Sequence, residues 1–287
     1  SGADISTIAE SFLDVHVVPI SGERVTELFH TLDHVARTLW DHDFSAYTSA
    51  DVSRMRDRGT YCIHADQIFV GANVRIDPCV VLDASMGPII IDPDVHIQPH
   101  SVVYGPCFIG SSSLIKAGAK IYGNTVIGEV CKVGGEVENS IIHAYSNKQH
   151  EGFLGHSYLG EWVNLGADTN TSDLKNTYAA ITITRRSNLI ETGRMFLGLL
   201  CGDHAKSGIN TMFGTGTVCG IHANVFGAGY TTPEIPSFAW GATGDSRVYP
   251  LKKAVAVART VMHRRNKELL DEEILLMNEE WSRTFPS

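Results

Sequence analysis

The middle of the chain repeats its hydrophobic pattern every six residues. Apolar side chains form one row: Ile91, Ile97, Val103, Ile109, Ile115, Ile121, Ile127 and Val133. Small or β-branched residues form a second row, four positions after the first: Val95, Ser101, Cys107, Ser113, Ala119, Thr125, Cys131 and Val137. A helix repeats about every 3.6 residues and a strand every two, so neither explains two rows with this period. The pattern predicts a β-helix of hexapeptide repeats, with about three short strands in each coil.

Helices are predicted on both sides of the repeat. An apolar stripe from Glu23 to Trp40 predicts an amphipathic helix, and Leu251 to about Trp281 also has the pattern of a helix, which can cover the open end of a β-helix. We therefore expect a mainly β fold in three parts: a helical lead-in (1–60), a β-helix (61–247) and a C-terminal helical extension (248–287).

The six-residue pattern breaks twice. It fails between Glu138 and Tyr158, and fails again from about Asn170 to Glu191, where a polar and β-branched stretch favours a protruding hairpin or loop. The first break contains His150. Because a regular prism offers no obvious place for a catalytic base, we expect the function to lie in this break.

Composition narrows the partners. A hydrophobic content of 43% and a charged content of 19% are typical of globular proteins, and the net charge of −9 disfavours nucleic acid or an anionic membrane as a partner. No apolar stretch is long enough to span a membrane, and Asp4, Glu10 and Asp14 stand where a signal peptide would be apolar, so a cytoplasmic location is expected. The six cysteines are expected as small core residues in a reduced compartment, with disulfides or a thiol nucleophile as the alternatives.

The segment from His150 to Thr169 carries a specific motif. After His150 it continues with two Leu-Gly pairs, then Val163-Asn164-Leu165-Gly166-Ala167, and then Thr169. This resembles the acetyltransferase domain of the bifunctional glucosamine-1-phosphate acetyltransferase/N-acetylglucosamine-1-phosphate uridylyltransferases, in their archaeal-like and Bacteroidetes-like branch. The resemblance covers about residues 63–245. It implies a left-handed β-helix, a homotrimer, acetyl-CoA as acyl donor and an amino-sugar 1-phosphate as acceptor.

The resemblance also implies roles for single residues. His150 would be the general base, because a histidine near its reference pKa of about 6.5 can take the proton of an amine as the new bond forms. Asn164 would contact the amino sugar, and Ala167 would offer its backbone to acetyl-CoA near the thioester. The further candidates for substrate binding are Lys116, Phe153 and Lys175. Those for coenzyme A are Asn210, Arg185 and Arg186.

Some positions depart from the motif. Phe153 stands where the family has a tyrosine that contacts phosphate, and Ser172 to Lys175 replace the family's Asn-Tyr-Asp-Gly. The phosphate would then be held by a lysine such as Lys116. These departures keep a second reading open: a non-catalytic β-helix that trimerises or regulates a sugar nucleotidyltransferase. On that reading His150 is an ordinary loop histidine and the arginines are surface charge.

Two other activities are not expected. The glycine-rich loop that binds nucleotide phosphates in the bifunctional enzymes has no counterpart here, so nucleotidyl transfer is not predicted, and residues 1–60 look like a remnant of that domain. Trimeric γ-type carbonic anhydrases share the β-helix and bind zinc, but two of their histidine ligands are five residues apart. His96 and His100 do not have that spacing, and no metal site is predicted.

Overall fold

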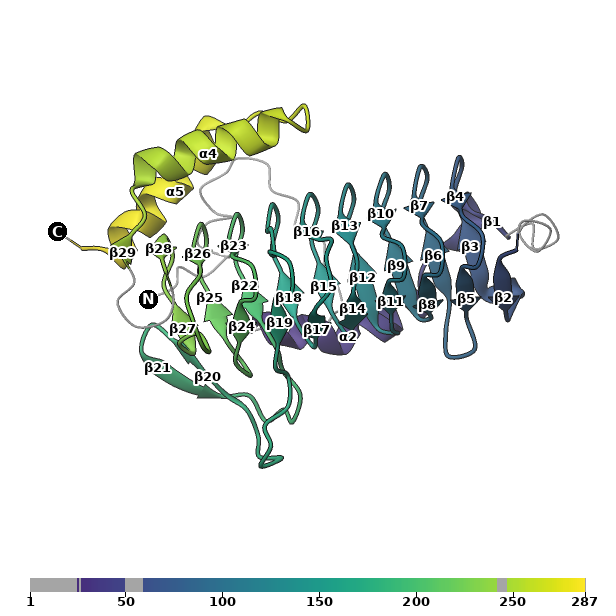
Figure 1. Ribbon diagram of the computed structural model, residues 1–287, viewed down its shortest axis with the longest axis horizontal. Helices are drawn as coiled ribbons and strands as arrows, with labels where there is room; N and C mark the ends of the chain where they lie inside the picture. The colour runs from purple at the N-terminus through teal and green to yellow at the C-terminus, as the bar shows by residue number, and fades with distance from the viewer. Residues whose placement is uncertain (1–24, 26, 50–58, 242–246, 287) are drawn as a thin grey trace, which may run out of the picture.

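The fold is a left-handed parallel β-helix with three flat faces, as predicted. The computed structural model describes residues 25, 27–49, 59–241 and 247–286. More than half of the expected lead-in (1–60) therefore lies outside the described residues. Each coil adds one strand to each face, and the coils stack along the long axis of the molecule (Figure 1).

The strands of each face run parallel to their neighbours from coil to coil. The first face contains β3 (Ile68–Val70), β6 (Ile89–Ile91), β9 (Cys107–Ile109), β12 (Thr125–Ile127), β15 (Ile141–Ile142), β18 (Tyr158–Leu159), β22 (Leu200–Cys201), β25 (Val218–Cys219) and β27 (Glu234–Ile235), with β1 (Thr48–Ser49) antiparallel to β3. The second face contains β4 (Arg75–Ile76), β7 (His96–Ile97), β10 (Leu114–Ile115), β13 (Lys132–Val133), β16 (Asn147–Lys148), β23 (Lys206–Ser207), β26 (Asn224–Val225) and β28 (Ala239–Trp240), with β29 (Arg247–Val248) antiparallel to β28. The third face contains β2 (Tyr61–Ile63), β5 (Val81–Asp83), β8 (Val102–Tyr104), β11 (Lys120–Ile121), β14 (Glu136–Glu138), β17 (Phe153–Gly155), β19 (Asn170–Thr171) and β24 (Met212–Phe213).

The β-helix is not interrupted between Glu138 and Tyr158, although the sequence pattern breaks there. β15, β16 and β17 take their regular places on the three faces. What changes is the length of the coil: Phe108 pairs with Val126, 18 positions on, whereas Val126 pairs with Ile141, 15 positions on. Shorter corners shift the phase of the apolar row, so the sequence pattern fails while the hydrogen-bonded stacking continues.

The second interruption is a protruding hairpin, which confirms the prediction. β20 (Thr182–Arg185) and β21 (Asn188–Glu191) pair antiparallel and project from the solenoid (Figure 1). We call residues 172–198 the insertion. It leaves the solenoid after β19 and returns before β22, and at its base the Leu197 N–H donates to the Asp173 carbonyl over 2.9 Å.

The first face is covered by the predicted N-terminal helix. After a single 3-10 turn, η1 (Leu28–His30), helix α2 (Thr31–Trp40) packs Val35 and Leu39 against Ile90 of β6. Phe29 and Leu32 pack against the insertion and Leu200 of β22. Two further 3-10 turns are η2 (Phe44–Ala46) and η3 (Ala65–Gln67).

The C-terminal segment forms two helices rather than one. They are α4 (Leu251–His263) and α5 (Asp271–Thr284), and they lie against the side of the last coils (Figure 1). On the second face, the last coil is followed by β29 instead of a helix. Among the described residues, no helix is long and apolar enough to cross a membrane.

Helices α4 and α5 pack on a ladder of stacked rings, which we call the aromatic edge. It runs along the corner between the first and second faces, one residue per coil: Tyr145, Trp162, His204, His222 and Phe238. All five have positive φ. Met262 of α4 contacts the Tyr145 end, and Ala254 and Met277 contact the Phe238 end. Aromatic stacking in this edge therefore joins the helices to several coils at once.

The six cysteines are free. Five are buried, as expected, and burial raises the pKa of Cys107 and Cys131 to about 12, which leaves these thiols unreactive. The expectation is wrong for Cys79, which is exposed at a corner.

The two histidines of the aromatic edge should make the fold sensitive to acid. Burial lowers the pKa of His204 to about 3, and that of His222 lower still, whereas both would titrate near 6.5 in the unfolded chain. Below pH 6.5 the unfolded chain therefore binds protons that the folded chain does not, and stability falls by up to about 1.4 kcal/mol per pH unit for each histidine. His222→Phe keeps the stacked ring without the titration. Thermal unfolding at pH 7 and pH 5 should show a smaller drop in Tm for this variant than for the wild type; equal drops would contradict the prediction.

Candidate functional site

Successive coils bring four of the predicted site residues to one corner. We call it the site edge: Lys116, His150, Ala167 and Asn210, between the second and third faces. Hydrogen bonds fix the register, since the Asp168 N–H donates to the Glu151 carbonyl over 3.1 Å and the Asn210 N–H donates to the Ala167 carbonyl over 2.8 Å. His150 and Ala167 are thus neighbours in adjacent coils, whose backbones lie about 4.8 Å apart.

His150 lies two residues after the end of β16, and its side chain is exposed. No hydrogen bond or ion pair to the imidazole is found among the residues that the structure describes, so the ring is open to a ligand. Its backbone is held instead: the His150 carbonyl accepts a hydrogen bond from Lys148 Nζ over 2.8 Å. The base candidate therefore has a fixed backbone and an accessible side chain.

Lys148 occupies a core position of the β-helix. Its register partner in β13 is Val133, and the partner of Val133 in β10 is Ile115, so the lysine belongs to the inward-facing apolar row. Only 2% of it is exposed. Nζ donates to the carbonyls of His150 and of Gly134, the latter over 2.9 Å. Burial lowers the pKa of Lys148 to about 8. A buried amine cannot bind a substrate phosphate, but its hydrogen bonds can stabilise the backbone of this corner.

A short corner makes room for the ammonium group. The site edge has four residues between β10 and β11 but only Gly134 and Gly135 between β13 and β14. Gly135 has φ +69°, and a Cβ there would lie 2.7 Å from Lys148 Nζ and 2.8 Å from the His150 carbonyl oxygen. Only glycine fits this close approach at positive φ.

The backbone of Ala167 offers a hydrogen-bond donor. Its carbonyl is used by Asn210, while its N–H donates to no other group within the described part of the chain. An N–H in this position can stabilise negative charge on a carbonyl oxygen beside His150. Asn210 itself is exposed, with φ 59°.

The remaining substrate candidates flank the site edge. Asn164 bridges Asn147 and Lys206 and so continues the second face. Phe153 opens β17 on the third face, and its N–H donates to Asn170 Oδ1 over 2.9 Å. Lys175 lies in the insertion, where Nζ donates to the Ala180 carbonyl over 3.2 Å. Phe153 is in the same coil as His150 and Asn164 is in the next coil, where it pairs with Asn147, whereas Lys175 has no contact with the site edge among the described residues.

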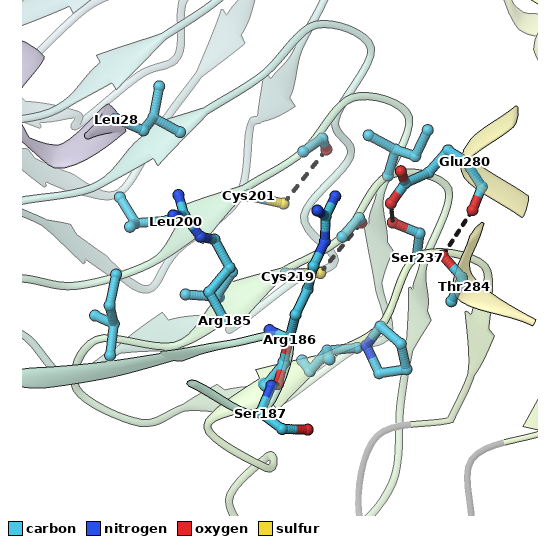
Figure 2. A pocket seen from close by; sticks show the side chains of 18 of the residues that line it. Leu28, Arg185, Arg186, Ser187, Leu200, Cys201, Cys219, Ser237, Glu280 and Thr284 are labelled. Atoms are coloured by element: carbon cyan, nitrogen blue, oxygen red, sulfur yellow. Dashed lines mark hydrogen bonds between the residues drawn. The ribbon is translucent and has the colours of Figure 1, made fainter. Parts of the chain in front are cut away.

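Arg185 and Arg186 lie away from the site edge. Arg185 ends β20 and Arg186 begins the turn at the hairpin tip, and both line a cavity of about 730 Å³ over the first face (Figure 2). Arg185 pairs with Glu27 over 2.8 Å. The Arg186 guanidinium has no ion-pair partner among the described residues, and its backbone N–H donates to Glu234. The floor of the cavity comes from β22 and β25, and α5 forms one wall.

A paired histidine and aspartate lie at the other end of β17. His156 Nδ1 and Asp173 Oδ2 are 2.7 Å apart, and the His156 ring stacks on Phe196. We call this corner, between the third and first faces, the insertion edge. Neither residue has a function predicted from the sequence. The signal was their separation of 17 residues, which is one coil and places both at the same corner.

In the parts of the chain that the structure describes, no three histidine, cysteine, aspartate or glutamate side chains gather as metal ligands would.

The chain resembles curated bifunctional proteins over about half its length. "Bifunctional protein GlmU" of Herminiimonas arsenicoxydans is 31% identical over 165 residues, which is 53% of this chain and 34% of that protein. A "Bifunctional sugar-1-phosphate nucleotidylyltransferase/acetyltransferase" of Sulfurisphaera tokodaii is 30% identical over 142 residues, 49% of this chain and 35% of that protein. The chain thus spans about a third of the length of these relatives, and the resemblance read from the motif is confirmed.

Solved structures and family models add little. LpxA, a UDP-N-acetylglucosamine acyltransferase from Bacteroides fragilis, aligns with 15% identity and a TM-score of 0.46, over 80% of this chain and 84% of its own. No family model matches the chain.

Two glycines of the site edge provide a matched test of how tightly the space around Lys148 Nζ is packed. Gly118 and Gly135 both have φ near +70°, but a Cβ at Gly118 would meet nothing within 4 Å. Gly118→Ala should cost about 1–2 kcal/mol for the backbone alone. Gly135→Ala should cost about 1–3 kcal/mol more, because the methyl group collides with Lys148 and the His150 carbonyl. Denaturant or thermal unfolding measures both, and equal losses would show that this space is not tightly packed.

Proposed function

We propose that the chain is an acetyl-CoA-dependent N-acetyltransferase that acts on an amino-sugar 1-phosphate, with His150 as general base. The observation that carries the proposal is that the accessible His150 imidazole and the unbonded Ala167 N–H are on adjacent coils of the same corner. The relatives whose names include acetyltransferase support it, as does the motif from His150 to Thr169. We place the enzyme in the cytoplasm.

The reaction needs a base and an oxyanion donor close together. The amine nitrogen attacks the thioester carbonyl carbon while His150 takes the amine proton. The carbonyl oxygen becomes negative and accepts a hydrogen bond from the Ala167 N–H. When the tetrahedral intermediate collapses, the carbon–sulfur bond breaks and the proton on His150 passes to the sulfur. The products are the N-acetyl sugar phosphate and free coenzyme A.

Residues around the site edge would bind the two substrates. Lys116 is half-buried at the same corner as Gly134, one coil earlier, and supplies a cation for the sugar phosphate. Asn164 and Phe153 flank the acceptor, and Asn210 lies along the path of the pantetheine arm. Lys175 would have to leave the Ala180 carbonyl to bind the acceptor. Phe153 has no hydroxyl, so the phosphate depends on the lysines.

The coenzyme A phosphates need a second cationic group. Arg185 and Arg186 line the cavity of the first face rather than the site edge. In a homotrimer, the arginines of one subunit would meet the coenzyme bound at the site edge of its neighbour. We therefore propose the homotrimer as the active form.

Acetyl-CoA and glucosamine 1-phosphate should release free thiol in the presence of this protein. His150→Ala should slow release at least 100-fold, equivalent to about 2.7 kcal/mol, because the variant lacks the imidazole that takes the amine proton. A thiol-reactive dye measures the rate. Galactosamine 1-phosphate tests the configuration of the acceptor.

His100→Asn is the matched control. His100 is exposed on the same corner of an earlier coil, at φ 64°, a conformation that asparagine tolerates. It should keep full activity. Unchanged turnover in His150→Ala would remove His150 from the mechanism. Absence of thiol release with every amino-sugar phosphate would favour the non-catalytic module.

Arg186 should contribute more to coenzyme binding than Arg185, because Arg185 is already paired with Glu27. Arg186→Ala should raise the KM for acetyl-CoA about tenfold and leave the KM for the dephospho form, which lacks the 3′-phosphate, nearly unchanged. Arg185→Ala should have the smaller effect. An equal rise for both donors would show that Arg186 does not bind this phosphate.

A further inference from the structure

The His156–Asp173 pair has the geometry of a hydrogen-bonding site that is ready for a ligand. The Asp173 carboxylate accepts the hydrogen of His156 Nδ1 over 2.7 Å, because a carboxylate has only lone pairs to offer. This fixes the tautomer and leaves the lone pair of Nε2 as an acceptor. Nε2 makes no hydrogen bond with any group in the described part of the molecule. Both side chains are mostly buried, with 18% and 15% exposed.

His156 borders a cavity that has both polar and apolar walls. The cavity is about 450 Å³ and is lined by His156, Phe196, Met195 and Arg194, among others. Phe196 and Met195 are 40% and 47% exposed and give the cavity an apolar surface. Arg194 is neutralised by Asp33 of α2 at 2.7 Å. An apolar wall beside a fixed acceptor suits a sugar ring, which has a face of C–H groups and a rim of hydroxyls, better than it suits a free anion.

β17 connects the His156–Asp173 pair with the Phe153 ring, which flanks the proposed acceptor site. A Cβ at Gly155 would lie 2.4 Å from both Phe153 Cζ and Asp173 Oδ2, so these two atoms are at most twice that distance apart. Phe153 follows His150 by three residues. The outer surface of β17 therefore runs from the base candidate, across the Phe153 ring, to the His156–Asp173 pair.

We propose that His156 and Asp173 form the hydroxyl-recognition site for the sugar ring of the acceptor, at the end of β17 opposite to His150. His156 Nε2 accepts the hydrogen of one ring hydroxyl, Asp173 holds the imidazole in that tautomer, and Phe196 packs against the ring's C–H face. This inference rests on the proposed function, because it assumes an amino-sugar acceptor. It assigns His156 a role in specificity and Asp173 a role in positioning, and it leaves proton transfer to His150.

The test is equilibrium binding of glucosamine 1-phosphate and of its 3-, 4- and 6-deoxy analogues, measured by calorimetry. A site built to bind a hydroxyl rejects the analogue that lacks it. The wild type should bind one of the three analogues at least tenfold more weakly than the parent sugar. In His156→Asn, which suits the φ of 43° at this corner, that ratio should fall to near one while the other two ratios stay unchanged. Asp173→Asn should reduce the ratio as well.

Asp77→Asn is the matched control, because Asp77 and His96 form a pair of the same 2.7 Å length on an earlier coil and should have no effect on any ratio. A general loss of structure would weaken all four ligands together, which would overturn the inference. Unchanged ratios in His156→Asn, or no binding of any sugar to the wild type, would also overturn it. Binding with the expected ratios but without thiol release would overturn only the proposed function.

Discussion

Hydrogen bonding between coils is the constraint on which this structure depends. Each strand has its peptide groups satisfied by the strands above and below it, so every coil must bring its three short strands into the same register. Residues can be lost at corners, as between β13 and β14, but not from this ladder. Side chains one coil apart are consequently stacked on one edge. The site edge, the aromatic edge and the insertion edge all arise from this single rule.

Sequence periodicity predicted the solenoid because the interior of each coil accepts only apolar or small residues. It misread the region around His150 because a coil of 15 residues shifts the row, and because Lys148 takes a core position that would normally be apolar. A one-dimensional pattern cannot distinguish a shortened corner from the end of a repeat. The hydrogen bonds from Lys148 Nζ, which make the buried amine tolerable, join carbonyls on two different coils.

The location of some candidate residues could be predicted from the sequence and that of others could not, again because of the repeat. Lys116, His150, Ala167 and Asn210 share an edge because they occupy equivalent corners, and spacing along the chain is enough to find them. The positions of Arg185 and Arg186 depend on how the hairpin folds back over the first face, where Glu27 and Glu234 hold it. That contact joins segments far apart in sequence and follows no repeat. The His156–Asp173 pair could have been noticed from its one-coil separation, but its cavity is formed by α2 and the insertion.

The insertion is closed at its base, where the backbones of Asp173 and Leu197 are hydrogen-bonded and the Gly198 N–H donates to the His156 carbonyl. The solenoid therefore continues as though the intervening residues were absent. Such a closed loop can be lengthened, shortened or exchanged during evolution without disturbing the register of any coil. The cavity beside His156 can therefore change shape while the corner that carries His150 keeps its place in the stack.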